Sequence, residues 1–242
     1  MTNKDTSKEN PLTISVVIPA YNEEKYLPLT LQSIKKQSLT PFEIIVADNN
    51  STDRTAEIAK EYGARVVHVK EQGNVYAMKG GLDAARGDII AGVDADTVVS
   101  TNWIEVINSA FRDDQVVGAT GSIRIADKTA FTSLNNFFYF IFLQINFWLG
   151  LPHLVGFNYA VRKDTYHKIG GVNIKYEMSS DVELGLRLKK FGKVVLVKKM
   201  QVAPSMRRWE KGWIKTAIQY GRGYVYTALL RKPVPLKQEI VR

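Results

Sequence analysis

The sequence predicts an α/β protein in which a mostly parallel sheet is flanked by helices. Short runs rich in valine and isoleucine alternate with helix-like segments through the first hundred residues. These runs are apolar throughout, which is typical of parallel strands that helices cover on both faces. The length of 242 residues and the ordinary apolar and charged fractions indicate a globular protein with a proper core.

Strands and helices alternate regularly in the first half. Ser51 or Thr52 is expected to cap the second helix, with Asp53 in its first turn. The carboxyl ends of parallel strands meet at one edge of a sheet, where ligands bind. Polar residues follow three of these strands and should therefore lie together. The expected strands are 14–21, 43–49, 64–69 and 88–94, and the expected helices are 24–38, 52–62 and 75–86.

The second half surrounds an uncharged segment. Between residues 129 and 161 there is no Asp, Glu, Lys or Arg. The pattern favours a buried helix, and leaves open a helix in the membrane surface or a membrane span. Polar side chains and a proline argue against a span, namely Asn135, Asn136, Gln144, Asn146 and Pro152. We expect helices at 102–111 and 181–191, and strands at 115–123, 154–161 and 193–197.

The C-terminal segment 206–242 is basic and aromatic. Such an amphipathic helix either lies on a membrane surface or packs on the core of its own domain. From Arg162 to Arg242 there are 19 Lys and Arg against 6 Asp and Glu, so this third should face something anionic. The residues at helical spacing on one stripe are Trp209, Trp213, Ala217, Tyr220 and Tyr224.

Composition also limits the chemistry and the compartment. The chain has no cysteine, which excludes disulfides and thiol catalysis and fits a reducing cytoplasm. Residues 1–12 are polar and are expected to form a disordered lead-in without a signal peptide. His68, His153 and His167 lack metal-ligand spacing, so we expect them to be structural.

Asp94 ends the apolar run at 88–94, and Asp96 follows two residues later. This pair is the clearest chemical signal in the sequence. Two carboxylates directed at one centre repel each other unless a divalent cation lies between them. Oxygen ligands select Mg²⁺ or Mn²⁺ over Zn²⁺. Because Mg²⁺ binds through one or two carboxylates together with substrate phosphates, the pair predicts a phosphate-bearing ligand.

Four motifs occur in an order that resembles the inverting family 2 glycosyltransferases of the GT-A fold. They are "ISVVIPAYNEEKYLPLTLQSIKKQS", "EIIVADNNSTDRTAEIA", "GDIIAGVDAD" and "SSDVELGLRLKKFG". The resemblance covers about residues 14–213. It implies a GT-A (Rossmann-like) sheet, a nucleoside-diphosphate sugar donor, and Mg²⁺ or Mn²⁺ as cofactor.

The resemblance implies a donor site after the first two strands. Pro19, Tyr21 and Glu23 match the loop that holds the nucleotide in the family, and Asp48 matches the acidic residue that contacts the base. The family usually has Asp-Gly where this chain has Asn49 and Asn50. The choice between uracil and guanine therefore stays open.

Further roles follow from the same resemblance. Asp96 matches the more direct metal ligand, and Asp94 matches the residue that addresses the ribose or sugar. Met78 and Lys79 stand where relatives often have an Arg-Asn pair. Lys79 is expected either to reach a phosphate or to be a solvated helix lysine.

Asp181 matches the catalytic base. Its expected place at the start of a helix predicts a pKa that is lowered rather than raised, because a helix N-terminus favours an ionised carboxylate. A base must be ionised before it takes the acceptor proton. The preceding residue is usually acidic in relatives, whereas here it is Ser180.

Acceptor and diphosphate contacts are implied for Asn158, Arg207, Arg208 and Trp209. The last three resemble the Q-x-x-R-W motif of processive synthases, but Ser205 replaces the glutamine. We therefore expect transfer of one sugar rather than synthesis of a polymer.

These expectations divide the chain into the lead-in 1–12, a nucleotide-sugar half 13–98, an acceptor and catalytic half 99–205, and the tail 206–242. The uncharged span and the basic tail predict a lipid or lipid-linked acceptor and a peripheral enzyme at the cytoplasmic face of an anionic membrane. Alternatives are a non-catalytic membrane-surface binder on the same scaffold and a sugar-phosphate nucleotidyltransferase, although the first loop lacks the glycines of the latter. No nucleic-acid recognition motif is present.

Overall fold

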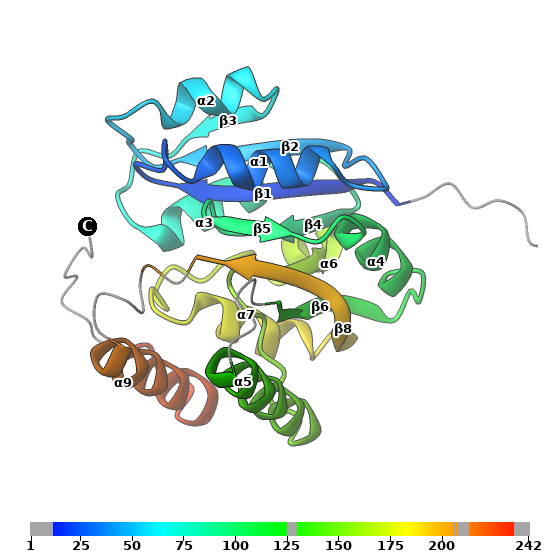
Figure 1. Cartoon of the computed structure of the whole chain (residues 1–242). Helices are drawn as coiled ribbons and strands as arrows, with labels where there is room; N and C mark the ends of the chain where they lie inside the picture. The colour runs from blue at the N-terminus through cyan, green and yellow to red at the C-terminus, as the bar shows by residue number, and fades with distance from the viewer. Residues whose placement is uncertain (1–11, 125–129, 206, 208–212, 235–242) are drawn as a thin grey trace, which may run out of the picture.

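The computed structural model describes residues 12–124, 130–205, 207 and 213–234. Within these residues one eight-stranded sheet has the order β3-β2-β1-β4-β7-β6-β8-β5 (Figure 1). The strands are β1 (Ile14–Ala20), β2 (Glu43–Asp48), β3 (Arg65–His68), β4 (Ile89–Gly92), β5 (Thr97–Val99), β6 (Val116–Ile123), β7 (Tyr159–Arg162) and β8 (Lys193–Pro204).

Helices cover both faces of this sheet, as the apolar strands predict. Strand β1 shows the alternation, because Val16 and Ile18 join one core cluster and Val17 joins the other. The first cluster includes side chains of α1, α2 and α4, and the second includes side chains of α3, α6 and α7. These helices are α1 (Leu27–Lys35), α2 (Thr55–Glu61), α3 (Asn74–Asp83), α4 (Trp103–Ala110), α6 (Lys163–Lys168) and α7 (Ser180–Leu188).

Sheet register brings the ends of the first strands to one edge. Strands β3, β2, β1 and β4 are mutually parallel, with Ala20 aligned on Asp48 and Asp48 on His68. Strand β7 runs antiparallel to β4 and places Tyr159 opposite Gly92. A Cβ at position 92 would lie 2.2 Å from the Tyr159 ring, so only glycine fits there.

The far end of the sheet closes back on the Asp94–Asp96 turn. Strand β5 pairs antiparallel with β8, with Thr97 opposite Pro204. Sequence periodicity did not predict β5 or α6, and it predicted β8 to end at 197. The structure extends β8 to Pro204 because its distal half pairs with β5 and β6.

An outer layer is formed by α5 (Ala130–Trp148), α9 (Trp213–Tyr224) and the π-helix η1 (Val225–Leu229). Figure 1 shows α5 and α9 beyond β8, at the opposite end of the molecule from α2. Phe142 of α5 and Tyr224 of α9 contact each other and His153, with ring centres 5.4–5.8 Å apart. Asn146 accepts a hydrogen bond from the Tyr224 hydroxyl.

The uncharged span 129–161 contains the expected helix, α5, but the prediction that this helix is buried is wrong. Leu143 is buried, but Trp148 is 84% exposed, and several other large apolar side chains of α5 face outward. These are Phe137, Phe138, Phe142, Ile145 and, just after the helix, Leu149. Among the described residues, no helix is both long and apolar enough to cross a bilayer.

The cap expected for α2 is also different. The helix begins at Thr55, and neither Ser51 nor Thr52 is its N-cap residue. Asp53 instead accepts a hydrogen bond from the Thr55 amide at 3.0 Å, while Ser51 and Thr52 bond to Asn22. The loop after β1 therefore recruits the residues that would otherwise cap the helix.

Candidate functional site

The turn between β4 and β5 holds Asp94 and Asp96 at the polar edge of the sheet. The backbone carbonyl of Asp96 accepts a hydrogen bond from the Ser205 amide at 3.0 Å, which fixes the end of β8 against the turn. Arg207 follows two residues later, and its Nε lies 2.8 Å from Asp96 Oδ2. The same guanidinium pairs with Glu23 in the loop after β1.

Glu23 reaches this group from the first strand. Its amide donates to the Thr55 hydroxyl at 2.7 Å, which holds the loop. Burial raises the pKa of Glu23, and the hydrogen bond and positive charge of Arg207 oppose that rise. One carboxylate oxygen, Oε2, is buried and has no hydrogen-bond partner among the described residues. An oxygen in this position suits a ligand that brings a donor or a cation.

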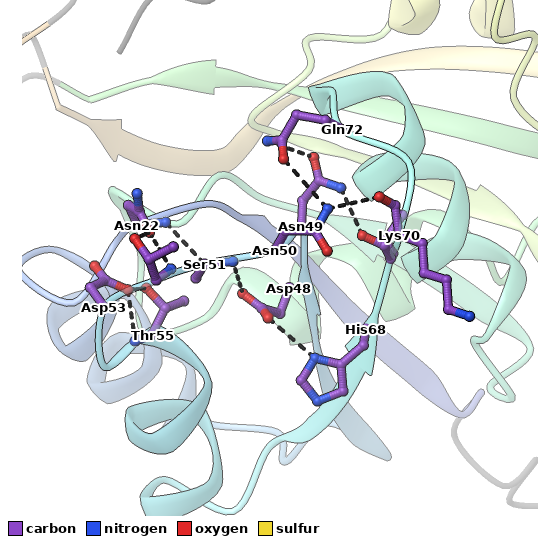
Figure 2. A network of polar contacts seen from close by, with 12 residues as sticks. Asn22, Asp48, Asn49, Asn50, Ser51, Asp53, Thr55, His68, Lys70 and Gln72 are labelled. Carbon is purple, nitrogen blue, oxygen red and sulfur yellow. Dashed lines mark hydrogen bonds and ion pairs between the residues drawn. The ribbon is translucent and has the colours of Figure 1, made fainter.

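Asp48 lies at the end of β2, beside the same edge (Figure 2). Its side chain is almost fully buried, with Oδ1 3.3 Å from the Ser51 amide and Oδ2 3.2 Å from His68 Nδ1. Pro19 and Tyr21 are partly exposed at the end of the adjoining strand. His68 contacts a predicted site residue, which spacing in the sequence did not reveal. Asp48 and His68 are aligned at the ends of the parallel strands β2 and β3, and this alignment could have predicted the contact.

Asn49 and Asn50 explain the departure from the family pattern. Figure 2 shows both amides directed at the loop after β3. The Asn49 amide nitrogen donates to the carbonyls of Val69 and Glu71 at 3.0 and 2.6 Å, and its oxygen accepts from the Gly73 amide at 2.7 Å. Asn50 donates to the Lys70 carbonyl at 2.8 Å and has a φ of 62°, a conformation that asparagine tolerates. The two residues tie the loop after β2 to the loop after β3.

Asp181 lies in the first turn of α7, as predicted, but its pKa is opposite to the prediction. Burial raises the pKa to about 6, although backbone hydrogen bonds from Val182 and Gly156 oppose the rise. The favourable field of the helix N-terminus does not compensate for lost hydration of the carboxylate. A Cβ at Gly156 would lie 3.0 Å from Asp181 Oδ2, so the glycine lets the chain approach the carboxylate.

Tyr159 connects the two aspartate regions. Its ring is buried against Gly92 in β4. Burial raises the pKa of the Tyr159 hydroxyl, and the negative charges of Asp181 and Asp94 raise it further. Asp181 at the start of α7 and Asp94 in the turn after β4 therefore both lie near this one buried hydroxyl.

Two departures from the family pattern contact each other. The Ser180 hydroxyl donates to the Met78 sulfur at 3.5 Å, and both side chains are buried. Lys79 forms an ion pair with Asp83 one turn along α3. In this structure the Lys79 ammonium is therefore paired within its own helix.

Asn158 has a structural role here. Its amide donates to the carbonyls of Ser122 and Met200 at 3.1 and 2.9 Å, and its oxygen accepts from Trp103 Nε1 at 2.9 Å. Its side chain has no exposed area, so it does not face an acceptor in this arrangement. The predicted residues Arg208 and Trp209, and most of the lead-in 1–12, lie outside the described residues.

The carboxylates at this edge fit a hard divalent cation. Asp96 already holds a positive guanidinium, and oxygen ligands suit Mg²⁺ or Mn²⁺. Across the part of the chain that the structure describes, no group of three or more acidic or histidine side chains could form a complete metal cage. Water and substrate oxygens would have to complete the coordination, as is usual for Mg²⁺.

Comparison with known proteins agrees with this geometry. Residues 15–170, more than half of the chain, match the family model "Glycosyl transferase family 2". "Probable glycosyltransferase YdaM" of Bacillus subtilis is 27% identical over 251 residues, which cover 93% of this chain and 58% of that protein. "4,4'-diaponeurosporenoate glycosyltransferase" of Staphylococcus haemolyticus is 39% identical over 124 residues, 48% of this chain and 33% of that protein. The chain spans less than two thirds of the length of either relative.

Solved structures show the same fold. The mannosyltransferase PcManGT from Pyrobaculum calidifontis, in complex with GDP-Man and Mn²⁺, has a TM-score of 0.74 and 16% identity. The likeness covers 93% of this chain and 66% of that one. Glucosyl-3-phosphoglycerate synthase from Mycobacterium tuberculosis, in complex with Mn²⁺, UDP and glucosyl-3-phosphoglycerate, has a TM-score of 0.60 and 22% identity, covering 93% and 82%. These likenesses confirm the predicted GT-A fold.

Proposed function

This chain belongs to glycosyl transferase family 2 and is a glycosyltransferase, and we propose that it inverts the anomeric centre in a metal-dependent transfer of one sugar. The donor is a UDP- or GDP-linked sugar, and the acceptor is a hydroxyl or phosphate of a membrane lipid or lipid-linked glycan. The observation that carries the proposal is that Asp94 and Asp181 both act on the buried Tyr159 hydroxyl, while Asp96 lies two residues from Asp94 in the same turn.

The donor would lie across the ends of β1, β2 and β4. Pro19, Tyr21 and Asp48 would border the base, and Asp94 the ribose or sugar, while Glu23 would lie beside the diphosphate. Lys79 would contribute to the phosphate site only if it left Asp83. The GDP-Man and the UDP in the two similar structures, each together with Mn²⁺, support a nucleoside-diphosphate donor.

A divalent cation held by Asp96 and Asp94 would neutralise the charge that develops as the nucleoside diphosphate leaves. Either Mg²⁺ or Mn²⁺ satisfies the oxygen ligands. The chain's own residues then have to orient the acceptor and take its proton.

Asp181 would be the general base. Its carboxylate takes the acceptor hydroxyl proton while the acceptor oxygen forms a bond to the anomeric carbon. The bond from that carbon to the diphosphate oxygen breaks, and its electron pair leaves with the nucleotide. A single displacement inverts the anomeric centre. With a pKa of about 6, Asp181 is ionised at neutral pH and is a stronger base than an ordinary aspartate.

The outer layer supports a lipid acceptor. Gln219 of α9 donates to the Met178 sulfur at 3.3 Å, and a Cβ at Gly223 would lie 2.7 Å from the Ser179 hydroxyl. Helix α9 therefore packs directly over the start of α7, where Asp181 lies. Tyr139 of α5 also lies near Asp181. Burial raises the pKa of the Tyr139 hydroxyl, and the negative charge of Asp181 raises it further. An acceptor would reach the base from the side of these two helices.

This layer also has the surface of a membrane-associated protein. Exposed apolar side chains of α9 and η1 continue those of α5, namely Ile218, Tyr220, Val225, Leu229 and, just beyond, Leu230. Exposed cations adjoin them, namely Lys189, Lys190, Lys198, Arg222, Arg231 and Lys232. Apolar side chains bordered by cations suit the interface of an anionic leaflet. We propose a peripheral position at the cytoplasmic face of the membrane, with the outer layer toward the lipid.

A transfer assay tests the proposal. Vesicles containing bacterial polar lipids would be incubated with the protein, Mn²⁺ and a panel of UDP- and GDP-sugars, and the lipids analysed by mass spectrometry. We expect one lipid class to gain the mass of a single sugar with wild type and not with Asp181→Asn. Metal-independent lipid binding without sugar transfer would instead favour the non-catalytic membrane binder.

A further inference from the structure

Arg207 forms the closest described contact to the proposed metal ligand. Its Nε lies 2.8 Å from Asp96 Oδ2, and its terminal nitrogen pairs with Glu23. The side chains of Glu23 and Asp96 are only 12% and 14% exposed, so little water screens these ion pairs. The guanidinium carbon also lies 4.5 Å from the centre of the Tyr26 ring, a cation–π contact. Two carboxylates and one aromatic ring thus surround one positive charge.

The backbone delivers this side chain to the site. Pairing of Thr97 with Pro204 and the hydrogen bond from the Ser205 amide to the Asp96 carbonyl anchor the chain on both sides of the turn. Arg207 needs no long reach to meet Asp96. The contact is therefore part of how β8 ends and not a chance encounter of a long surface side chain.

A metal ion and this guanidinium compete for the same carboxylate. Two cations held within a few ångströms in a half-buried site repel each other strongly. A metal ion alone would have to displace Arg207 and leave it without an anion. A metal ion that arrives with a diphosphate brings new anionic oxygens for both cations, because guanidinium groups bind phosphate well.

We propose that Arg207 is the resident counter-cation of Asp96 and Glu23, and that a metal-bound nucleoside diphosphate displaces it while the bare metal ion does so poorly. The inference rests on the proposed function, since it requires the donor site at Asp96. It assigns Arg207 a positioning role: it makes metal binding depend on the nucleotide, and it holds the carboxylates in place until the donor arrives.

The first test measures Mn²⁺ binding without nucleotide, by electron paramagnetic resonance of free Mn²⁺. We expect Arg207→Gln to bind Mn²⁺ about tenfold more tightly than wild type, equivalent to ~1.4 kcal/mol of lost competition. With saturating UDP or GDP this advantage should disappear or reverse. Arg54→Gln is the matched control, because it removes one positive charge from an exposed helix pair with Glu57 and Glu61. It should bind Mn²⁺ like wild type.

The second test follows the guanidinium directly. The Nε–H signal of Arg207 in a ¹⁵N spectrum, assigned by its loss in Arg207→Lys, should be protected from exchange in the free protein. Mg²⁺ together with the nucleotide should shift it, and Mg²⁺ alone at the same concentration should not.

The outcomes separate this inference from the proposed function. If wild type binds metal and nucleotide together but Arg207→Gln binds bare Mn²⁺ no more tightly, the inference is wrong and the proposed function stands. If neither protein binds metal with or without nucleotide, both are wrong. A Nε–H signal that exchanges freely before any ligand is added would also overturn the inference.

Discussion

Two regions of this protein are stabilised in contrasting ways. One is the edge of the sheet at the ends of β1, β2 and β4, where we propose that the donor binds and which we call the donor edge. The other is the outer layer. At the donor edge, Asn22, Asp48, Asn49 and Asp53 hold the loops by hydrogen bonds to backbone groups, within a sheet whose register fixes every strand end. In the outer layer, α5 and α9 meet through aromatic contacts, and about half of their described large apolar side chains are exposed. This contrast agrees with our proposals that the first region holds a polar ligand in a set geometry and that the second meets an apolar surface.

Asp181 lies where these two regions meet, and its removal should have the largest effect. Asp181→Asn should lower kcat by about 10²–10⁴-fold, the usual contribution of a general base. Binding of the metal-bound nucleotide should stay within about twofold of wild type, because a general base acts on the acceptor proton and not on the donor. Steady-state rates and calorimetry check the two parts. Equal losses of binding and rate would mean that Asp181 belongs to the donor site.

The same residue should make stability depend on pH. The folded-state pKa of Asp181 is raised to about 6, so its ionisation opposes folding. That destabilisation is absent below the ordinary aspartate pKa near 4 and complete above pH 6. Asp181→Asn should therefore be more stable than wild type by about 1–3 kcal/mol at pH 8 and equally stable at pH 4. Urea unfolding at both pH values measures this, and an unchanged difference across the range would contradict the raised pKa.

The hydrogen bonds made by buried side chains of the donor edge should contribute strongly to the free energy of unfolding. Asn49→Ala removes three contacts of a buried amide and leaves backbone groups unsatisfied, which should destabilise the protein by about 1–3 kcal/mol. Asn50→Gly is the matched control, because it keeps the left-handed backbone and removes exposed contacts only. It should cost less than about 1 kcal/mol. Similar losses in thermal or urea unfolding would contradict the rigid-edge account.

The outer layer should show the reverse behaviour, with little effect on folding and a clear effect on lipid binding. Trp148→Glu should reduce partitioning to anionic vesicles at least about tenfold, since burying a large apolar side chain contributes about 1.5–3 kcal/mol. Its unfolding free energy should change by less than about 0.5 kcal/mol. Leu29→Glu is the control, because Leu29 is 58% exposed on α1, outside the outer layer. Equal flotation of both variants would remove the case for this membrane face.

The same contrast decides what could be predicted from the sequence. Continuous apolar runs identified β1 to β4 within one or two residues. Polar residues at the strand ends led to the proposal of a donor site at this edge. The short strand β5 carries too few residues for a periodic signal, and it exists because β8 returns to pair with it. Similarly, the apolar composition of α5 cannot reveal whether protein or lipid covers it, because both environments favour the same side chains.

The site residues divide along the same line. Asp94, Asp96 and Asp181 are predicted because residue type and motif agree, and Asp48 is predicted from the resemblance to the family. The pKa of Asp181 could not be predicted, because burial by distant segments outweighs the local effect of the helix N-terminus. The contacts of Asn158, His68 and Arg207 depend on which strands become neighbours, which no single segment encodes.

We propose that Asp96 holds a metal-dependent nucleotide site at the carboxyl edge of the sheet. Calorimetric titration of UDP and GDP, each with and without Mn²⁺, into wild type and Asp96→Asn tests it most directly. One nucleotide should bind wild type only with Mn²⁺, and Asp96→Asn should lose this binding while its unfolding midpoint stays near that of wild type. Nucleotide binding of equal strength without metal, or undiminished in Asp96→Asn, would contradict it.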